Sequence, residues 1–374
     1  MNDRVKKLRD RSLASRPSIS AERARLLTEF YRAEEGRHAT PLMRALSFKH
    51  LCEHKSIYIG EGELIVGERG PAPLAVPTFP ELTCHSVEDL EILDTRPKTS
   101  YAVDREVLDT YRETVVPYWK GRSIRDRVFP ELPAEWHDAY AAGVFTEFME
   151  QRAPGHTVAD GKIYQKGLRD LQAEIDAELA GLDDADPETP DRRAQLEAMH
   201  AAAEANIIFA RRHAALAREM AASEQDPVRR AELELIAETC DHVPAHAPRT
   251  FHEALQSYWF HHLAVITELN GWDAFNPGHL DHHLWPYYER ECATGTLDRE
   301  KARELLQCFW VKFNNHPAPP KVGVTAQESG TYTDFANINI GGLTREGEDA
   351  VNEVSYLLLE VIDEMHVLQP SNNI

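Results

Sequence analysis

The sequence predicts a helix-rich α/β fold, and three observations lead to this class. Residues 104–240 are dominated by Ala, Glu, Arg and Leu, with apolar side chains recurring at the three- and four-residue steps of amphipathic helices. Two shorter stretches, 56–69 and 331–340, change to β-rich runs and to two-residue alternation. No repeat of fixed period is present, so we expect one large domain over residues 1–374.

Residues 1–150 are predicted to form a helical N-terminal part that contains a β-hairpin. Thr40 and the Pro that follows it begin a helix with Pro in its first turn. Two β-rich runs flank a Gly-rich turn within 56–69, which predicts the hairpin. Ser86 and Asp89 have the spacing of a capping box, so another helix is expected to begin there.

Residues 151–250 are predicted to hold long helices. The segment 158–222 reads as two helices joined through 183–190, with outward charges that are more simply solvated than functional. Before them, the sequence RAPGHT at 152–157 contains the Pro-Gly pair that ends a helix. We therefore expect a break at the point where the long helices begin.

Residues 251–374 are predicted to provide pocket helices and a barrel strand. The stretch 251–287 opens on a helix with one apolar stripe, breaks at an Asn-Gly pair and restarts after a Pro-Gly pair. Residues 331–340 alternate with one mostly polar face, which suits a barrel wall facing a solvated cavity. The final residues, 369–374, read as the start of a loop and strand.

The composition favours small molecules or proteins as partners. Lys and Arg total 41 against 62 Asp and Glu, and this net charge of -21 disfavours nucleic acid and anionic membranes. No apolar run approaches the length of a membrane span, and the first residues lack the apolar stretch of a secretory signal. Five scattered cysteines without a CxxC pair predict free thiols in a reducing cytoplasm.

The residue types alone suggest two chemistries, a metal site and a cysteine nucleophile. Histidines gather between 252 and 283, where His279 and His283 flank Asp281 at a spacing that can share a metal ion. Because HExxH is absent, hydrogen-bonded histidines are the simpler interpretation, and we predict no metal site. Cys84, next to His85, is the local candidate for a nucleophile, which requires an exposed thiol near a base.

A third hypothesis is a binding pocket built from separated turns. An Arg and a His converging on one cavity would suit an anionic or hydroxylated small molecule. The alternative is structural, with the aromatic side chains in the core, Asp273 capping a helix and Arg152 paired with a surface acid. The predicted pocket residues are Phe148, Arg152, His156, Asp273, Phe275, Ser329 and Phe335.

Six separated segments resemble the glycyl radical enzymes of the pyruvate formate-lyase type. The resemblance covers essentially the whole chain and is nearest the C–X lyase and dehydratase branch, which includes hydroxyproline dehydratases, choline trimethylamine-lyases and isethionate sulfite-lyases. The segments are IYIGEGELIVGERG (57–70), FPELTCHSVEDLEIL (79–93), RAPGHTV (152–158), VPAHAPRTFHEALQSYWF (243–260), WDAFNPGHLDHHL (272–284) and YTDFANINIGG (332–342).

The resemblance implies an N-terminal helical shell and the first half of a ten-stranded barrel. It also implies a cytoplasmic, oxygen-sensitive enzyme that cleaves a C–X bond of a small polar substrate by radical chemistry. No cofactor is expected to bind directly, since a radical-SAM activating enzyme with an iron–sulfur cluster makes the glycyl radical. The complete enzyme is expected to be a homodimer.

The resemblance also assigns pocket positions. His156 matches the hydroxyproline dehydratases, Arg152 resembles the sulfonate-binding arginine of isethionate lyases, and Phe148 is a pocket position. Asp273, Ser329 and Phe335 resemble hydroxyproline dehydratase positions, and Phe335 also fits the choline lyase wall. The set is mixed, so the substrate stays open.

The chain departs from the family pattern in one respect. Neither Gly-Cys-x-Glu, which holds the thiyl cysteine, nor RVxGY, which holds the radical glycine, occurs in it. We therefore assign no catalytic residue and expect the N-terminal part of an enzyme, inactive alone. Alternatives are a subunit of a split enzyme that pairs with a second polypeptide, a non-catalytic binding or scaffold remnant, and a formate C-acetyltransferase-like activity.

Overall fold

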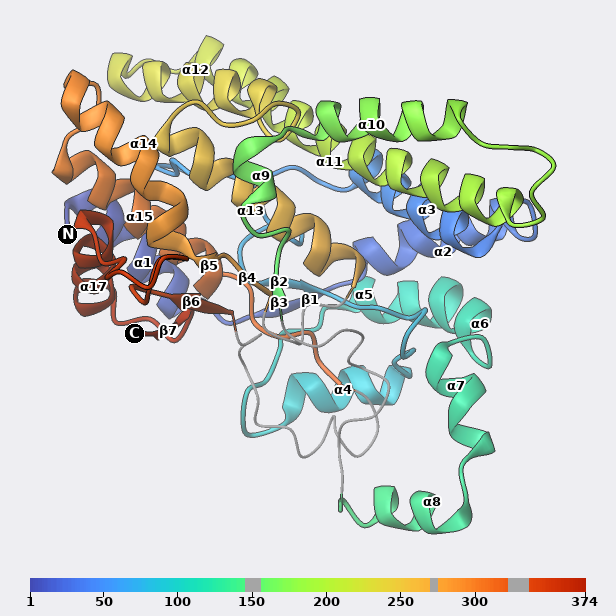
Figure 1. The fold of residues 1–374 in the computed structure, drawn as a ribbon. Helices are drawn as coiled ribbons and strands as arrows, with labels where there is room; N and C mark the ends of the chain where they lie inside the picture. Colours follow the sequence, from blue (N-terminus) through green and yellow to red (C-terminus); the bar gives the residue numbers. More distant parts are fainter. Residues whose placement is uncertain (145–155, 270–274, 322–335) are drawn as a thin grey trace.

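The computed structural model of the chain describes residues 1–144, 156–269, 275–321 and 336–374. Long helices surround short strands that lie near the middle of the molecule, and this arrangement confirms the predicted helix-rich α/β class (Figure 1). Within those ranges, no helix combines the length and apolar character needed to cross a membrane.

The first half of the described chain contains short helices and three strands. In chain order the elements are α1 (Asp3–Ala14), β1 (Ser18–Ser20), α2 (Glu22–Glu34), α3 (Thr40–His54), β2 (Ala75–Pro77), α4 (Val87–Thr95), α5 (Arg105–Thr110), the π-helix η1 (Tyr111–Val115), α6 (Val116–Trp119), α7 (Ile124–Val128), the 3-10 helix η2 (Phe129–Glu131), α8 (Ala134–Ala141) and β3 (His156–Thr157).

The second half holds the longest helices and the remaining strands. They are α9 (Lys162–Gln165), α10 (Leu168–Ala180), α11 (Thr189–Ser223), α12 (Pro227–His242), α13 (Phe251–Glu268), β4 (Phe275–Asn276), β5 (Gly278–His279), α14 (Leu280–Thr294), α15 (Arg299–Asn314), β6 (Asn337–Asn339), α17 (Glu353–Met365) and β7 (Ser371–Asn373).

Several predicted helix signals are confirmed. Helix α3 begins at Thr40 with Pro in its first turn. At the start of α4 the Ser86 side chain accepts from the Asp89 N–H and the Asp89 side chain accepts from the Ser86 N–H, which is the predicted capping box. The two helices expected in 158–222 are α10 and α11.

Helix α11 is the long member of a helical layer that also includes α3, α10 and α12 (Figure 1). At about 1.5 Å per residue its 35 residues span roughly 50 Å. The side that packs inward carries alanines at helical spacing, namely Ala210, Ala214, Ala217 and Ala221, all buried. Small side chains on that face let neighbouring helices pack close to α11.

Helices α13 and α15 form the centre of the largest hydrophobic cluster. Trp259 and Phe260 on α13 and Phe309 and Trp310 on α15 are almost fully buried. Helix α1 packs on α15, and the Met1 amino group lies 2.6 Å from a Glu364 carboxylate oxygen on α17. Both chain ends therefore lie on the same side of the molecule (Figure 1).

All of the described strand pairs are parallel. Strand β1 pairs with β2, β3 pairs with β4, and β5, β6 and β7 form a three-stranded sheet in that order. Strands β6 and β7 confirm the strands predicted in 331–340 and 369–374 over their described residues. The ten-stranded barrel remains a prediction.

The hairpin predicted for 56–69 is wrong, because this segment contains no strand. Its backbone contains a turn and bends, and it bonds to side chains instead of to a second strand. The Gln256 amide donates to the Val66 carbonyl and accepts from the Val66 N–H, both at 2.9 Å. Trp259 Nε1 donates to the Gly67 carbonyl, also at 2.9 Å. Helix α13 thus replaces the partner strand.

Candidate active site

Three segments that were predicted to contribute to one pocket meet at a strand junction. In the parallel pair β3–β4 the backbone of His156 lies opposite Phe275, and the Val158 N–H donates to the Asn276 carbonyl at 3.0 Å. The Asn276 side-chain oxygen in turn accepts from the backbone N–H of Asn337 in β6. The helix break, the central stretch and the late strand therefore come together at their described ends.

The structure locates two of the seven predicted pocket residues. His156 is placed by its backbone in β3, opposite Phe275. The Phe275 side chain is 3% exposed and belongs to the main hydrophobic cluster, so it packs against the helical layer. The other five, Phe148, Arg152, Asp273, Ser329 and Phe335, lie outside the described residues, and their roles stay predictions.

Asparagine side chains mark the polar side of the junction. Asn337 and Asn339 flank the fully buried Ile338 in β6, as the predicted alternation requires. Asn373 Nδ2 donates to Asn339 Oδ1 at 3.2 Å, and Asn337 Oδ1 has no hydrogen-bond partner in the described ranges. Such amides can orient a polar ligand. The pocket prediction missed them, although the strand alternation of 331–340 already set these positions apart.

Asp281, at the start of α14, fixes the loop that follows β6. One carboxylate oxygen accepts from the Gly341 N–H at 2.7 Å and from the Ser355 hydroxyl of α17. The other accepts from the His282 N–H at 3.0 Å. Because this buried carboxylate is fully engaged by the protein, its role is to join α14, α17 and the sheet.

The suggested pairing of His279 with His283 is wrong. His283 Nε2 instead lies 3.2 Å from an Asp160 carboxylate oxygen, and its ring stacks on Tyr164. His279 groups with Asp281 and His282, whose potential ligand atoms lie within 4.8 Å of one another. The remaining histidines of this region bond within the protein, as expected: His252 to the Leu64 carbonyl, His261 to the Ser257 carbonyl and His262 to the Tyr258 hydroxyl.

Cys84 does not fit the nucleophile hypothesis. Burial, together with the nearby carboxylates of Asp126 and Asp89, raises the pKa of the Cys84 thiol to about 12. The neighbouring His85 is buried, and its Nε2 lies 3.2 Å from the Pro320 carbonyl oxygen. The thiol therefore stays protonated at neutral pH, and its Sγ donates to the His85 backbone carbonyl and not to the ring.

A cavity of about 1250 Å³ adjoins the strand junction on the helical side. It lies between α3, α10, α11 and α13, and Phe275 and Val158 contribute to its wall. Most of the lining is apolar, while Arg44 and Glu268 form an ion pair at one side. Burial raises the pKa of Glu268, which the nearby guanidinium of Arg44 counteracts. The cavity thus differs in polarity from the asparagine side of the junction.

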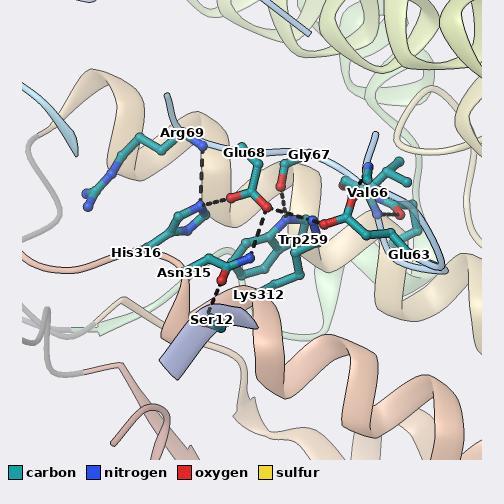
Figure 2. A network of polar contacts seen from close by, with 12 residues as sticks. Ser12, Glu63, Val66, Gly67, Glu68, Arg69, Trp259, Lys312, Asn315 and His316 are labelled. Atoms are coloured by element: carbon teal, nitrogen blue, oxygen red, sulfur yellow. Dashed lines mark hydrogen bonds and ion pairs between the residues drawn. The ribbon is translucent and has the colours of Figure 1, made fainter. Parts of the chain in front are cut away.

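A buried polar network lies beside the core of α13 and α15 (Figure 2). Lys312 Nζ donates to Glu63 and to Glu68, each at 2.7 Å. Glu68 also accepts from Asn315 at 3.2 Å and from His316 Nε2 at 2.8 Å. All five side chains are nearly inaccessible to water. No local sequence pattern predicts this network, because its charged residues are far apart in the chain.

Burial and the neighbouring charges shift the pKa values of the ionisable groups in this network. Burial by itself would raise the pKa of Glu68, but Lys312 and His316 outweigh it and lower that pKa to about 2. Burial lowers the pKa of His316 to about 4 despite its bond to Glu68, so the ring is neutral at pH 7. Its ring stacks on Trp259, with ring centres 5.1 Å apart. The network therefore clamps the segment after α15 to the segment before β2.

Comparison with known sequences gives a consistent family. A model of the pyruvate formate lyase-like family matches residues 1–374. The chain is 53% identical over 373 residues to trans-4-hydroxy-L-proline dehydratase of Clostridioides difficile, covering all of this chain and 47% of the relative. It is 33% identical to isethionate sulfite-lyase of Nitratidesulfovibrio vulgaris, covering 92% of this chain and 43% of the relative. The chain thus spans about half the length of these curated relatives.

Solved structures agree with the sequence comparison. The crystal structure of the Clostridioides difficile hydroxyproline dehydratase with trans-4-hydroxy-L-proline bound matches with a TM-score of 0.95, covering 100% of this chain and 47% of that one. The B12-independent glycerol dehydratase of Clostridium butyricum matches with a TM-score of 0.92 at 30% identity, covering 100% and 47%. A helix-rich fold, the strand junction and these similarities lead to one conclusion: the chain belongs to the pyruvate formate lyase-like family of glycyl radical enzymes.

Proposed function

We propose that this chain is the substrate-binding N-terminal part of a glycyl radical dehydratase. Its substrate would be a small hydroxylated amino acid of the trans-4-hydroxy-L-proline class. The observation that carries the proposal is the 53% identity to a dehydratase of this substrate across the whole chain, against 33% or less to the isethionate lyases. His156 at the strand junction is consistent with it.

The junction supplies the chemistry that such a substrate requires. A hydroxylated amino acid presents a carboxylate, an amine and a hydroxyl, which need donors and acceptors at fixed positions. Under the proposal, Arg152 and His156 bind the anionic end, while Asp273 and the β6 asparagines bind the amine and hydroxyl. Phe148, Ser329 and Phe335 complete the wall and exclude water, whereas Phe275 packs on the apolar side of the junction.

The radical-bearing residues belong, in this proposal, to sequence beyond these 374 residues. Relatives are about twice as long, and the motifs of the thiyl cysteine and radical glycine do not occur in this chain. They accompany this part either in one longer polypeptide or in a second one. A radical-SAM activating enzyme would install the radical, and the complete enzyme would act as a homodimer in the cytoplasm.

The test is a substrate screen with the complete protein, activated anaerobically by its activating enzyme. Electron paramagnetic resonance first verifies the glycyl radical. We then expect consumption of trans-4-hydroxy-L-proline but not of choline, isethionate or 1,2-diols. Turnover of isethionate would instead favour a sulfite-lyase, and turnover of choline a trimethylamine-lyase. Absence of the radical signal under verified activator turnover would contradict the family role.

Pocket variants sharpen the assignment. We expect His156→Ala and Asp273→Ala each to abolish turnover while leaving the radical signal unchanged, because both residues contact substrate and not the radical. His283→Ala is the matched control, since its ring faces Asp160 and Tyr164. Normal rates in both pocket variants would overturn the pocket assignment without affecting the family.

A further inference from the structure

The last turn of α3 carries two histidines and a glutamate that face one another. His50, Glu53 and His54 follow the spacing H-x-x-E-H, and their potential ligand atoms lie within 4.8 Å of one another. Residues three and four apart share one face of a helix, and a His pair at this spacing is a common way to hold zinc. The His50 and His54 rings have centres 4.2 Å apart.

Both imidazoles are prepared to act as ligands. His54 Nδ1 lies 2.8 Å from the His50 carbonyl oxygen, so Nδ1 carries the proton and Nε2 keeps its lone pair. His50 Nε2 is buried and has no hydrogen-bond partner in the part of the chain that the structure describes.

The surroundings favour a cation. The carboxylate of Glu53 is held only loosely, with Lys49 Nζ 3.9 Å away, and can turn toward the histidines. On the facing helix α2, Arg25 and Glu29 pair with each other at 2.7 Å, which leaves little net charge there. The site also lies at the C-terminal end of a 15-residue helix, where the helix dipole stabilises positive charge.

We propose that His50, Glu53 and His54 form a binding site for a borderline divalent metal ion, with zinc as the expected occupant. Two imidazoles and one carboxylate give three protein ligands, and water completes a tetrahedral site. Because the ligands bridge the last turn of α3, bound zinc would also stabilise that helix against unfolding.

A second histidine cluster, at the start of α14, serves as a comparison for the site on α3. His279, Asp281 and His282 are as close together, but the Asp281 oxygens are engaged by Gly341, Ser355 and the His282 N–H. A metal there would have to break bonds that hold α14, α17 and the sheet together. We therefore expect zinc to bind at the site on α3 and not at the second cluster.

The test is calorimetric titration of the metal-free chain with zinc chloride under reducing conditions. We expect one ion per chain and a rise in Tm with zinc. His54→Ala should weaken zinc binding more than tenfold and remove the rise in Tm. Glu53→Gln should weaken it several-fold, and His282→Ala should change neither quantity. Cobalt in place of zinc should give the visible absorption of a tetrahedral site in the parent chain but not in His54→Ala.

Three results would overturn the proposal. The first is no zinc binding by the parent chain, and the second is unchanged affinity in both His54→Ala and Glu53→Gln. The third is binding that disappears only when thiols are alkylated, which would assign the ion to cysteines. Cys52, on the same helix, is an unsuitable ligand because its side chain is buried in the main hydrophobic cluster. A circular dichroism spectrum of each variant shows that α3 is still folded.

Discussion

The network around Lys312 is buried, the junction of β3, β4 and β6 is only partly buried, and the two regions use their polar groups in opposite ways. In the network, Lys312 and the two glutamates bond to charged or amide partners within the protein. At the junction, neutral amides predominate, and Asn337 Oδ1 finds no partner among the described residues. A frame requires satisfied charges, whereas a binding site requires polar atoms that are still available to a ligand.

The largest expected effect comes from removing the cation of the network. Lys312→Met leaves Glu63 and Glu68 as buried carboxylates without their cation, which should lower the free energy of unfolding by about 3–5 kcal/mol. Denaturation by urea measures the change. Lys166→Met, which breaks an exposed pair with Glu174, should have a much smaller effect on the free energy of unfolding. Equal losses in the two variants would show that the network does not frame the fold.

The second effect is acid destabilisation through His316. Its pKa is about 6.5 in the unfolded chain and about 4 in the native one, so only the unfolded chain gains a proton between these values. Stability is therefore complete above pH 6.5 and falls as pH decreases toward 4, by up to about 3 kcal/mol. Unfolding measured from pH 7 to 4.5 should show this slope, and His316→Gln should reduce it. The surface variant His38→Gln should leave the slope unchanged.

The third effect tests whether α13 replaces a partner strand. Gln256→Leu keeps the size of the side chain but leaves the N–H and carbonyl of Val66 without their partner. We expect a loss of about 2 kcal/mol in the free energy of unfolding. Gln225→Leu is the control, because Gln225 is exposed. A neutral Gln256→Leu variant would mean that water satisfies the 63–67 backbone.

The smallest effect is expected at the junction. Asn276→Ala removes the acceptor for the Asn337 N–H and should lower the free energy of unfolding by about 1 kcal/mol. Asn339→Ala removes a bond to the exposed Asn373 and should cost less than about 0.5 kcal/mol. If Asn276→Ala lowered the free energy of unfolding as much as Lys312→Met, the junction would stabilise the fold to the same extent as the network.

Local signals were sufficient for the helices but not for the segment before β2. The Ser86–Asp89 capping box and the start of α3 depend on neighbouring residues, and both are confirmed. The 56–69 hairpin failed because β-rich runs specify an extended backbone without specifying what pairs with it. That partner, Gln256, lies about 190 residues later in the chain, outside any local pattern.

In the candidate site, too, local patterns could be predicted from the sequence and contacts between distant segments could not. Periodicity identified the strand that contains Asn337 and Asn339, because alternation is a local property. The buried ion pairs of Lys312 could not be foreseen, since Glu63 and Glu68 lie about 250 residues away in the chain and are ordinary surface residues by composition. The alternative in which His279 and His283 share a metal ion failed because helical spacing takes no account of Asp160, an acceptor from another element.

The parallel pairing of the strands has a consequence for biosynthesis. Strand β3 pairs with β4, which lies about 120 residues later in the sequence. Strand β6 can pair with β7 only after residues 371–373 have been synthesised. The helix pairs α2–α3 and α10–α11 are each contiguous in the chain and need no such delay. As the ribosome releases the chain, a helical scaffold should therefore assemble first, and the strands that carry the polar site should be the last to find their neighbours.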